Sequence, residues 1–396
     1  MIRVLCIDGE GGWGGSSRSL AKSLQYLDRD AVRAEVWCRR EGPIQEVYAR
    51  LGIPCRIVPQ IPASGAVERF SRNLASEALA QIGWLRSKTI KTNLLSRIRE
   101  VDLVHFNLES QWRLACWLRP QHDRAQTMHV RTNPIDNMFA RRQSRAAVAA
   151  VNRFVFITEN ERMHFERMVG QAVSGEVIFN IVDRENVNIA PHPAIPMDNR
   201  LRVGVLSNFA WQRGVDRLVD VAEAIAERGQ RDDIVFIIAG HMHLRGHLEG
   251  RLKALGRCGS TFADYVNERG LGDMFVFLGH VSQPEAVYVS CDVLAKPTRL
   301  DNPWGRDIIE ALAFGRPVIS IGTYDCFVEN NVTGFLLQSF DPEIWAERLL
   351  SLHHDRELCR RLGAAGSERV ATLCNGPARA ADLLSLWQEA VSARRL

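Results

Sequence analysis

The sequence predicts an α/β protein with two domains, each built on a parallel sheet with crossover helices. Three observations lead to this fold class. Short apolar runs typical of buried strands alternate with amphipathic stretches along most of the chain, and parallel strands joined by helices have this pattern. A chain of 396 residues exceeds one ordinary domain and suits two of about 180 to 200 residues each. Hydrophobic residues make up 46% of the chain, enough for a sizeable core.

The predicted first domain, residues 1–185, opens with a strand at 2–7 and a glycine-rich loop at 8–18. An amphipathic helix is expected to begin near Ser16 or Ser17. Glycines let a backbone approach a ligand closely. A flexible strand-to-helix turn is the alternative, because the loop lacks regular glycine spacing and the lysine of a phosphate-binding loop. Further strands are expected at 34–38, 55–58, 103–107, 125–130 and 153–158.

Residues 186–200 are the predicted linker, since Pro191, Pro193 and Pro196 exclude a helix or a central strand there. The predicted second domain, residues 201–378, opens with a strand at 201–206, and the run at 234–240 is a second buried strand. From residue 342 onward the pattern is helical, and residues 379–396 form the last predicted helix.

Residues 294–322 carry the strongest functional pattern. A strand end leads into a turn-rich loop, then a helix that Gly315 and Pro317 terminate, then a strand at 318–321. The free N–H groups and the dipole at the start of such a helix favour an anion such as phosphate. Glu310 lies one turn further along, where a carboxylate can accept hydrogen bonds from ribose hydroxyls. A nucleoside diphosphate is the simplest ligand for this pairing.

The same run, from Pro297 to Val318, resembles the donor-site signature of retaining glycosyltransferases of the GT4 family (glycosyl transferases group 1), which have the GT-B fold. That signature has two glutamates separated by seven residues; Glu310 matches the second, and Asn302 stands at the first. The resemblance implies two Rossmann-like, doubly wound domains facing across a cleft, with the acceptor on the first domain and the nucleotide sugar on the second. Strands at 177–183, 274–279 and 287–295 fit it, and it implies that the last helix crosses back to the first domain.

The resemblance also implies roles for single residues of the first domain. Gly14 and Gly15 would face the donor phosphate and the acceptor. His129 ends a strand at the carboxyl edge of the predicted sheet, where open α/β sheets bind ligands. Its family-like role is to hydrogen-bond the hydroxyls of the transferred sugar, and a purely structural role is the alternative.

In the second domain, Arg213 matches one of two cation positions of the diphosphate site, and the neutral Asn208 stands at the other. Because two phosphates normally need more than one cation, we hypothesise that Arg306, next to Gly305, restores the missing charge. Pairing of Arg306 with Asp301 or Asp307 is the alternative. The expected catalytic residues are His129, Arg213, Asn302 and Glu310; the expected nucleotide-binding residues are Gly14, Gly15, Asn208, Arg213, Gly305, Arg306 and Glu310.

The expected activity is transfer of a hexosyl group from a nucleotide-diphosphate sugar to an acceptor hydroxyl with retention of configuration, in bacterial cell-surface polysaccharide or glycoconjugate biosynthesis. The acceptor would be a glycan, a lipid-linked molecule or a small molecule. Since Asn302 carries no charge, the alternative is a GT-B nucleotide-sugar-binding protein with lost or epimerase-like activity. No metal or other cofactor is expected, because the family needs none; His241, His243 and His247 are interpreted as an exposed loop.

Other partners are constrained by charge and composition. A net charge of +4 does not require a nucleic acid, and none is expected. Nine cysteines without a C-x-x-C pair favour a reducing cytoplasm, and the N-terminus reads as a strand instead of a signal peptide. Residues 85–99 carry five cations and no acid, which fits peripheral contact with the anionic inner face of a membrane or a solvated helix face.

Overall fold

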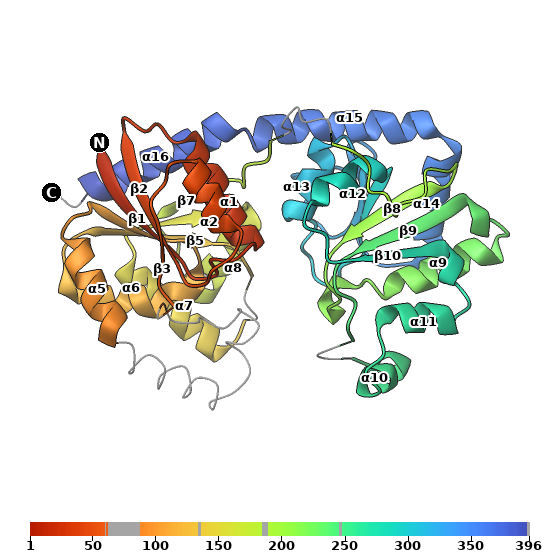
Figure 1. Cartoon of the computed structure of the whole chain (residues 1–396), viewed down its shortest axis with the longest axis horizontal. Helices are drawn as coiled ribbons and strands as arrows, with labels where there is room; N and C mark the ends of the chain where they lie inside the picture. Colours follow the sequence, from red (N-terminus) through yellow and green to blue (C-terminus); the bar gives the residue numbers. More distant parts are fainter. Residues whose placement is uncertain (60, 62–87, 134–135, 184–188, 245–247, 394–396) are drawn as a thin grey trace. The chain divides into compact units, whose positions relative to one another are not determined.

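The computed structural model describes residues 1–59, 61, 88–133, 136–183, 189–244 and 248–393. The chain forms two compact units, Met1–Ile181 with Cys374–Leu396 (unit 1) and Val182–Leu373 (unit 2). Both consist of a parallel sheet and helices (Figure 1), which confirms the predicted fold class. The boundaries expected at 185 and 378 lie a few residues beyond these, and residues 186–188 of the expected linker lie outside the described residues.

The described sheet of unit 1 has seven parallel strands in the order β3-β2-β1-β4-β5-β6-β7. The first strand therefore pairs with both β2 and β4, and the direction of strand addition reverses between β1 and β4. The strands are β1 (Ile2–Asp8), β2 (Val32–Cys38), β3 (Cys55–Ile57), β4 (Leu103–Phe106), β5 (Ala125–Val130), β6 (Arg153–Phe156) and β7 (Gly175–Val177).

Helices cover both faces of this sheet because alternate residues of a buried strand point to opposite sides. Leu5 and Ile7 of β1 pack with α5, α6, α7 and α8, whereas Val4 and Cys6 pack with α1, α2 and α16. Thus the end of the chain completes one face of unit 1. The helices are α1 (Gly15–Tyr26), α2 (Ile44–Arg50), α5 (Lys88–Ile98), α6 (Trp112–Leu118), α7 (Met138–Ala150), α8 (Glu159–Val169) and α16 (Gly376–Ser392).

Unit 2 repeats this plan with six described parallel strands in the order β10-β9-β8-β11-β12-β13. The strands are β8 (Leu201–Leu206), β9 (Ile234–Ala239), β10 (Phe275–Gly279), β11 (Val293–Lys296), β12 (Val318–Ile321) and β13 (Gly334–Leu337). The helices are α9 (Arg217–Glu227), α10 (Gly250–Arg257), α11 (Phe262–Glu268), α12 (Pro284–Ser290), α13 (Arg306–Ala313), α14 (Pro342–His354) and α15 (Arg356–Leu373).

Two strand predictions were wrong in part. The strand expected at 177–183 is β7, which begins at Gly175 and ends at Val177. Its neighbour β6 ends at Phe156 because Thr158 is already the N-cap of α8. The hydrogen bonds between β6 and β7 therefore end with the one from Ile178 N–H to Phe156 O. Of the run expected at 287–295, the first residues belong to α12, which Pro284 starts; proline suits the first turn of a helix.

The basic segment expected at 85–99 is described from Lys88 onward, as α5. Ile90, Leu94 and Ile98 are buried in the core of unit 1, and Arg97 pairs with Glu35 and Glu100. Membrane contact through this segment stays a prediction. Among the described residues, no helix is long and apolar enough to cross a bilayer.

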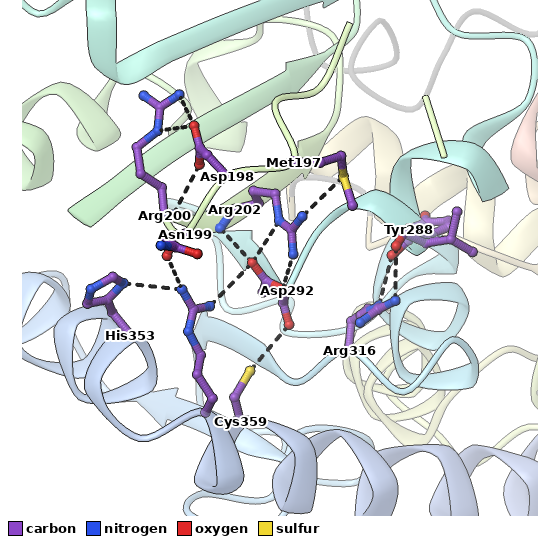
Figure 2. A network of polar contacts seen from close by, with 12 residues as sticks. Met197, Asp198, Asn199, Arg200, Arg202, Tyr288, Asp292, Arg316, His353 and Cys359 are labelled. Atoms are coloured by element: carbon purple, nitrogen blue, oxygen red, sulfur yellow. Dashed lines mark hydrogen bonds and ion pairs between the residues drawn. The ribbon is translucent and has the colours of Figure 1, made fainter. Parts of the chain in front are cut away.

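An arginine–aspartate pair holds the amino ends of β8 and β11 together (Figure 2). Asp292 accepts hydrogen bonds from the backbone N–H of Arg202 at 2.9 Å, from its Nε at 2.9 Å and from its Nη2 at 2.7 Å. Arg202 also contacts the sulfur of Met197, and Arg356 donates to Asn199 O, so the end of the expected linker is bound to unit 2. Unit 1 repeats the pair, since Asp102 accepts from the backbone N and guanidinium of Arg3.

Replacing Asp292 with Asn is expected to destabilise its sheet more than replacing Asp102 with Asn. The Arg202 and Asp292 side chains are 16% and 15% exposed, whereas those of Arg3 and Asp102 are 50% and 23% exposed, so water screens the second pair more. We expect losses of about 2–3 kcal/mol and about 0.5 kcal/mol respectively. Hydrogen-exchange protection of β8 and of β1 measures each loss; equal losses would contradict this reasoning.

Candidate functional site

The loops that follow β8 and β11 pack tightly against each other at the carboxyl edge of unit 2. Arg299 N–H donates to Gln212 O at 3.0 Å, and the Thr298 hydroxyl lies 3.2 Å from the same oxygen. Gly214 has a φ of 69°, and a Cβ on it would lie 1.9 Å from Pro297 O. Only glycine fits this backbone, so the sequence Arg213-Gly214 places its arginine at the junction of the two loops.

Arg299, which the sequence analysis did not single out, joins the same two loops. Its guanidinium donates to both carboxylate oxygens of Asp216, at 2.8 and 2.7 Å, and to Trp211 O at 2.7 Å, and it lies over the Trp211 ring. Two parallel charge-assisted bonds fix the orientation of both partners. The residues next to Arg299 in the sequence do not indicate this role, because its partner Asp216 lies 83 positions away.

The buried Lys296, also missed, fixes the start of α13. Its ammonium donates to Trp304 O at 2.5 Å and to Asp307 Oδ1 at 3.0 Å. Gly305, with a φ of 138°, precedes the helix, and a Cβ there would lie 3.0 Å from the Lys296 ammonium. The expected anion site at this helix start thus lies beside a buried cation. A lysine that ends an otherwise apolar strand was the available signal.

Glu310 is buried on α13 and is held on both sides. Arg306 donates to its Oε1 from Nε at 2.9 Å and from Nη2 at 2.8 Å, while the Tyr288 hydroxyl donates to Oε2 at 3.1 Å. Asp307 pairs with Lys296, and Asp301 accepts from Thr323, so these carboxylates have other partners. Arg306 thus forms its ion pair with Glu310, and not with Asp301 or Asp307, at the start of α13.

The remaining predicted residues of unit 2 differ in exposure. Asn302 is half-buried, and its side-chain oxygen lies 2.6 Å from the Thr298 hydroxyl. Asn208 is exposed, and its side-chain oxygen accepts the His241 N–H at 2.8 Å, which ties the loop after β8 to the loop after β9. The Arg213 guanidinium is exposed and has no hydrogen bond or ion pair to any residue that the structure describes.

In unit 1 the glycine-rich loop is closed by its own carboxylate. Glu10 accepts the Gly14 N–H at 3.1 Å and the Ser17 hydroxyl at 2.8 Å, so a carboxylate already lies at the start of α1. A helix start favours an anion, and Glu10 supplies one. Gly14 and Gly15 lie at the start of α1, where the first strand leads into the first helix, as the sequence predicts. A phosphate that approached the Gly14 N–H would have to displace the Glu10 carboxylate.

His129 lies on β5 and is buried together with His105 of β4. His105 Nε2 lies 2.8 Å from His129 Nδ1, and His105 Nδ1 lies 2.8 Å from the Thr127 hydroxyl. Burial, with the nearby Arg131 guanidinium, lowers the pKa of His105 to about 3 and holds the pKa of His129 well below its ordinary value. Both imidazoles are neutral at physiological pH.

Arg131, next to His129, is held in place by three amide or carbonyl oxygens. It donates to Asn107 O at 3.0 Å, to Asn107 Oδ1 at 2.8 Å and to Asn180 Oδ1 at 2.9 Å. The buried Glu109, which the sequence analysis missed, accepts the Arg131 N–H at 3.0 Å, and burial raises the pKa of its carboxyl. These polar groups cluster where β4 and β5 end.

One cluster has the residue types of a metal site. Possible ligand atoms of Asp233, His353 and His354 lie within 4.8 Å of one another. Arg356, however, donates to His353 Nδ1 at 3.2 Å, so the proton of a neutral His353 lies on Nε2, the nitrogen that faces Asp233. The cluster fits a polar contact better than a metal site. His241 and His243 are exposed after β9, and His247 lies outside the described residues.

Gly214→Ala is expected to destabilise unit 2 much more than Gly229→Ala. Both glycines have positive φ, which costs an alanine about 1–2 kcal/mol. Nothing lies within 4 Å of a Cβ on Gly229, whereas Pro297 O blocks one on Gly214, which adds at least about 2 kcal/mol. Urea denaturation of the two variants measures the difference, and similar midpoints would contradict the loop packing.

Stability is expected to fall as the pH drops below about 6.5, in part because of His105. An unfolded histidine gains its proton near pH 6.5, whereas folded His105 stays neutral down to about pH 3. The unfolded state binds more protons between these values, so each such histidine lowers stability by about 1.4 kcal/mol per pH unit there. In His105→Gln, the slope of unfolding free energy between pH 6 and 5 should decrease by about that amount; an unchanged slope would show that His105 protonates in the folded state.

Comparison with known proteins points to one family. A model described as glycosyl transferases group 1 matches residues 193–369. A D-inositol 3-phosphate glycosyltransferase of Corynebacterium efficiens is 31% identical over 34% of this chain and 32% of its own length. A GDP-mannose-dependent alpha-(1-6)-phosphatidylinositol monomannoside mannosyltransferase of Mycobacterium tuberculosis is 27% identical over 54% of this chain and 56% of its own. The chain thus spans about a third of the first relative and about half of the second.

The fold extends the similarity to almost the whole chain. The crystal structure of HepE from Anabaena, in complex with UDP and glucose, has a TM-score of 0.75 and covers 98% of this chain and 100% of its own, at 18% sequence identity. At this level of sequence identity the similarity shows that the two proteins share a fold. Residues 193–369 of the chain are thus similar to the glycosyl transferases group 1 family, and the fold of the chain is that of the GT-B glycosyltransferases.

Proposed function

We propose that this protein is a retaining glycosyltransferase that moves a sugar from a nucleoside diphosphate sugar to an acceptor hydroxyl. The carboxyl edge of unit 2 carries the proposal: the start of α13, with Arg306 and the buried Glu310, lies next to the packed loops that present Arg213. Open α/β sheets bind ligands at this edge, where strand order reverses, and here β8 and β11 are the strands on either side.

In the proposed complex the diphosphate contacts the α13 start and Arg213. Negative charge grows on the departing diphosphate as the sugar leaves, so cations and N–H groups aimed at it stabilise the transition state more than the ground state. The guanidinium of Arg213, which is exposed and has no ion pair to a described residue, is suited to this role. Lys296 and Arg306 lie behind Gly305, each in an ion pair with a carboxylate, Asp307 and Glu310, that offsets part of its charge. Glu310, oriented by Arg306 and Tyr288, accepts hydrogen bonds from the ribose.

The departing diphosphate itself would take the acceptor proton on the face it leaves, so that no dedicated carboxylate base is needed and configuration is retained. Asn302 and His129 would hydrogen-bond the transferred sugar. No metal takes part in this scheme, since fixed cations supply the charge. The names of two relatives mention GDP-mannose, D-inositol 3-phosphate and phosphatidylinositol monomannoside, which supports a nucleotide-sugar donor and an acceptor in glycoconjugate biosynthesis.

Arg213→Ala is expected to weaken binding of the nucleotide sugar by about 10- to 100-fold, since it removes a charge-assisted contact to phosphate. Arg306→Ala should weaken it less, because Lys296 remains nearby. Arg228→Ala is the matched control: this arginine pairs with Glu343 at the far end of α9. Thermal shift across UDP-, GDP-, ADP- and dTDP-sugars identifies the donor, and titration calorimetry then measures each affinity.

Three outcomes separate the possibilities. Release of the nucleoside diphosphate from labelled donor and acceptor supports the transferase. Binding without release favours the non-catalytic or epimerase-like alternative, for which Asn302 in place of glutamate is the specific observation. If no nucleotide sugar raises the unfolding temperature, or if Arg213→Ala and Arg228→Ala bind equally well, the proposed site is wrong. Unchanged affinity in Arg306→Ala refutes only the charge compensation.

A further inference from the structure

Three buried side chains in unit 1 are linked by hydrogen bonds, from Trp387 on the last helix through His105 to His129, the residue expected to bind the sugar. Trp387 of α16 donates its indole N–H to His105 Nδ1 at 3.4 Å, and His105 Nε2 lies 2.8 Å from His129 Nδ1. Trp387 and His105 are fully buried, and His129 is 4% exposed. The His105 ring meets the His129 ring edge-on, with centroids 4.9 Å apart. Water therefore does not compete for these bonds.

The register of the sheet places the two histidines together. His105 of β4 lies opposite Thr127 of β5, and His129 follows two residues later, so all three side chains point to the same face. That face is the one that α16 covers, with Trp387 in its core. Trp387 is thus brought to His105 across 282 positions of sequence.

The chemistry of the three groups determines where each proton lies. An indole nitrogen can only donate, so His105 Nδ1 must accept. The proton of a neutral His105 is then on Nε2, which donates to His129 Nδ1, and the proton of a neutral His129 is on its Nε2. The Thr127 hydroxyl, which can rotate, lies 2.8 Å from the same nitrogen and shares its single lone pair with the indole N–H. Burial keeps both rings neutral, because their pKa values lie far below the ordinary one.

We propose that Trp387 and His105 are positioning residues that hold His129 in the tautomer with its proton on Nε2. In this tautomer His129 can donate a hydrogen bond to a sugar oxygen and has no lone pair on Nε2 with which to act as a base. No residue that the structure describes hydrogen-bonds His129 Nε2. The sugar as ligand rests on the proposed function, whereas the tautomer does not.

The tautomer is measurable in the free protein by NMR of ring-¹⁵N-labelled histidine, with the His129 signals assigned from their loss in His129→Gln. We expect Nδ1 of His129 in the range of an unprotonated imidazole nitrogen and Nε2 in that of a protonated one. In Trp387→Phe, Thr127 is the remaining hydrogen-bond partner of His105 Nδ1 among the described residues, and its hydroxyl can accept as well as donate. Both His129 signals should therefore move toward averaged values.

Trp387→Phe is also expected to lower kcat about five- to tenfold, the rate equivalent of one hydrogen bond. KM for the nucleotide sugar should change less than twofold, because the candidate donor residues lie in unit 2. Trp345→Phe is the matched control: Trp345 is fully buried in unit 2, and its Nε1 has no hydrogen-bond partner among the described residues. It should leave the His129 signals and kcat unchanged.

A protonated Nδ1 on His129 in the native protein would overturn the inference, as would His129 signals that do not respond to Trp387→Phe. The same response in Trp345→Phe would reduce Trp387 to a packing residue and overturn it too. If Trp387→Phe fails to fold, the spectrum of the native protein alone decides the tautomer. The expected tautomer in a protein that transfers no sugar would uphold the inference and refute the proposed function.

Discussion

The pairing of β8 with β11 is the constraint on which the candidate donor site depends. These strands are far apart in sequence, and their adjacency brings the loop that ends at Gly214 against Pro297 so closely that a single methyl group would not fit. At the opposite end, Asp292 binds the backbone and side chain of Arg202 and fixes the relative position of the same two strands. Because the strands cannot slide, Arg213 and the start of α13 keep their spacing.

Charged side chains then shape this edge of the sheet. Burying a charge is costly unless it is paired and hydrogen-bonded. Lys296 with Asp307, Arg299 with Asp216 and Arg306 with Glu310 meet that condition. The first pair joins β11 to α13, the second joins the two loops, and the third lies within α13. Because desolvation offsets much of the attraction in a buried ion pair, these pairs fix the orientation of the side chains more than they stabilise the fold. Arg213, left exposed, is then the group suited to meet an incoming phosphate.

In unit 1 the candidate residue His129 is oriented by buried neutral side chains, whereas ion pairs orient the candidate residues of unit 2. His105 and His129 lie in a sheet that α16 covers, and the low dielectric keeps both imidazoles uncharged. In such surroundings each hydrogen bond restricts the next, so the donor-only indole of Trp387 determines the proton positions of two histidines. The last helix thereby completes the core and also orients a side chain on β5.

Strand and helix periodicity, with the glycines and prolines that end the elements, determined the fold class, the strands at 201–206 and 318–321 and the helix that carries Glu310, because these features depend on neighbours in sequence. The run at 287–295 and the end of β7 were misjudged, since whether an apolar segment joins a sheet depends on which partner strand continues beside it. Only the tertiary structure decided that Arg306 binds Glu310, that Lys296 and Arg299 hold the loops, and that Trp387 meets His105. These partners are brought together by strand order and helix packing, and no local pattern records them.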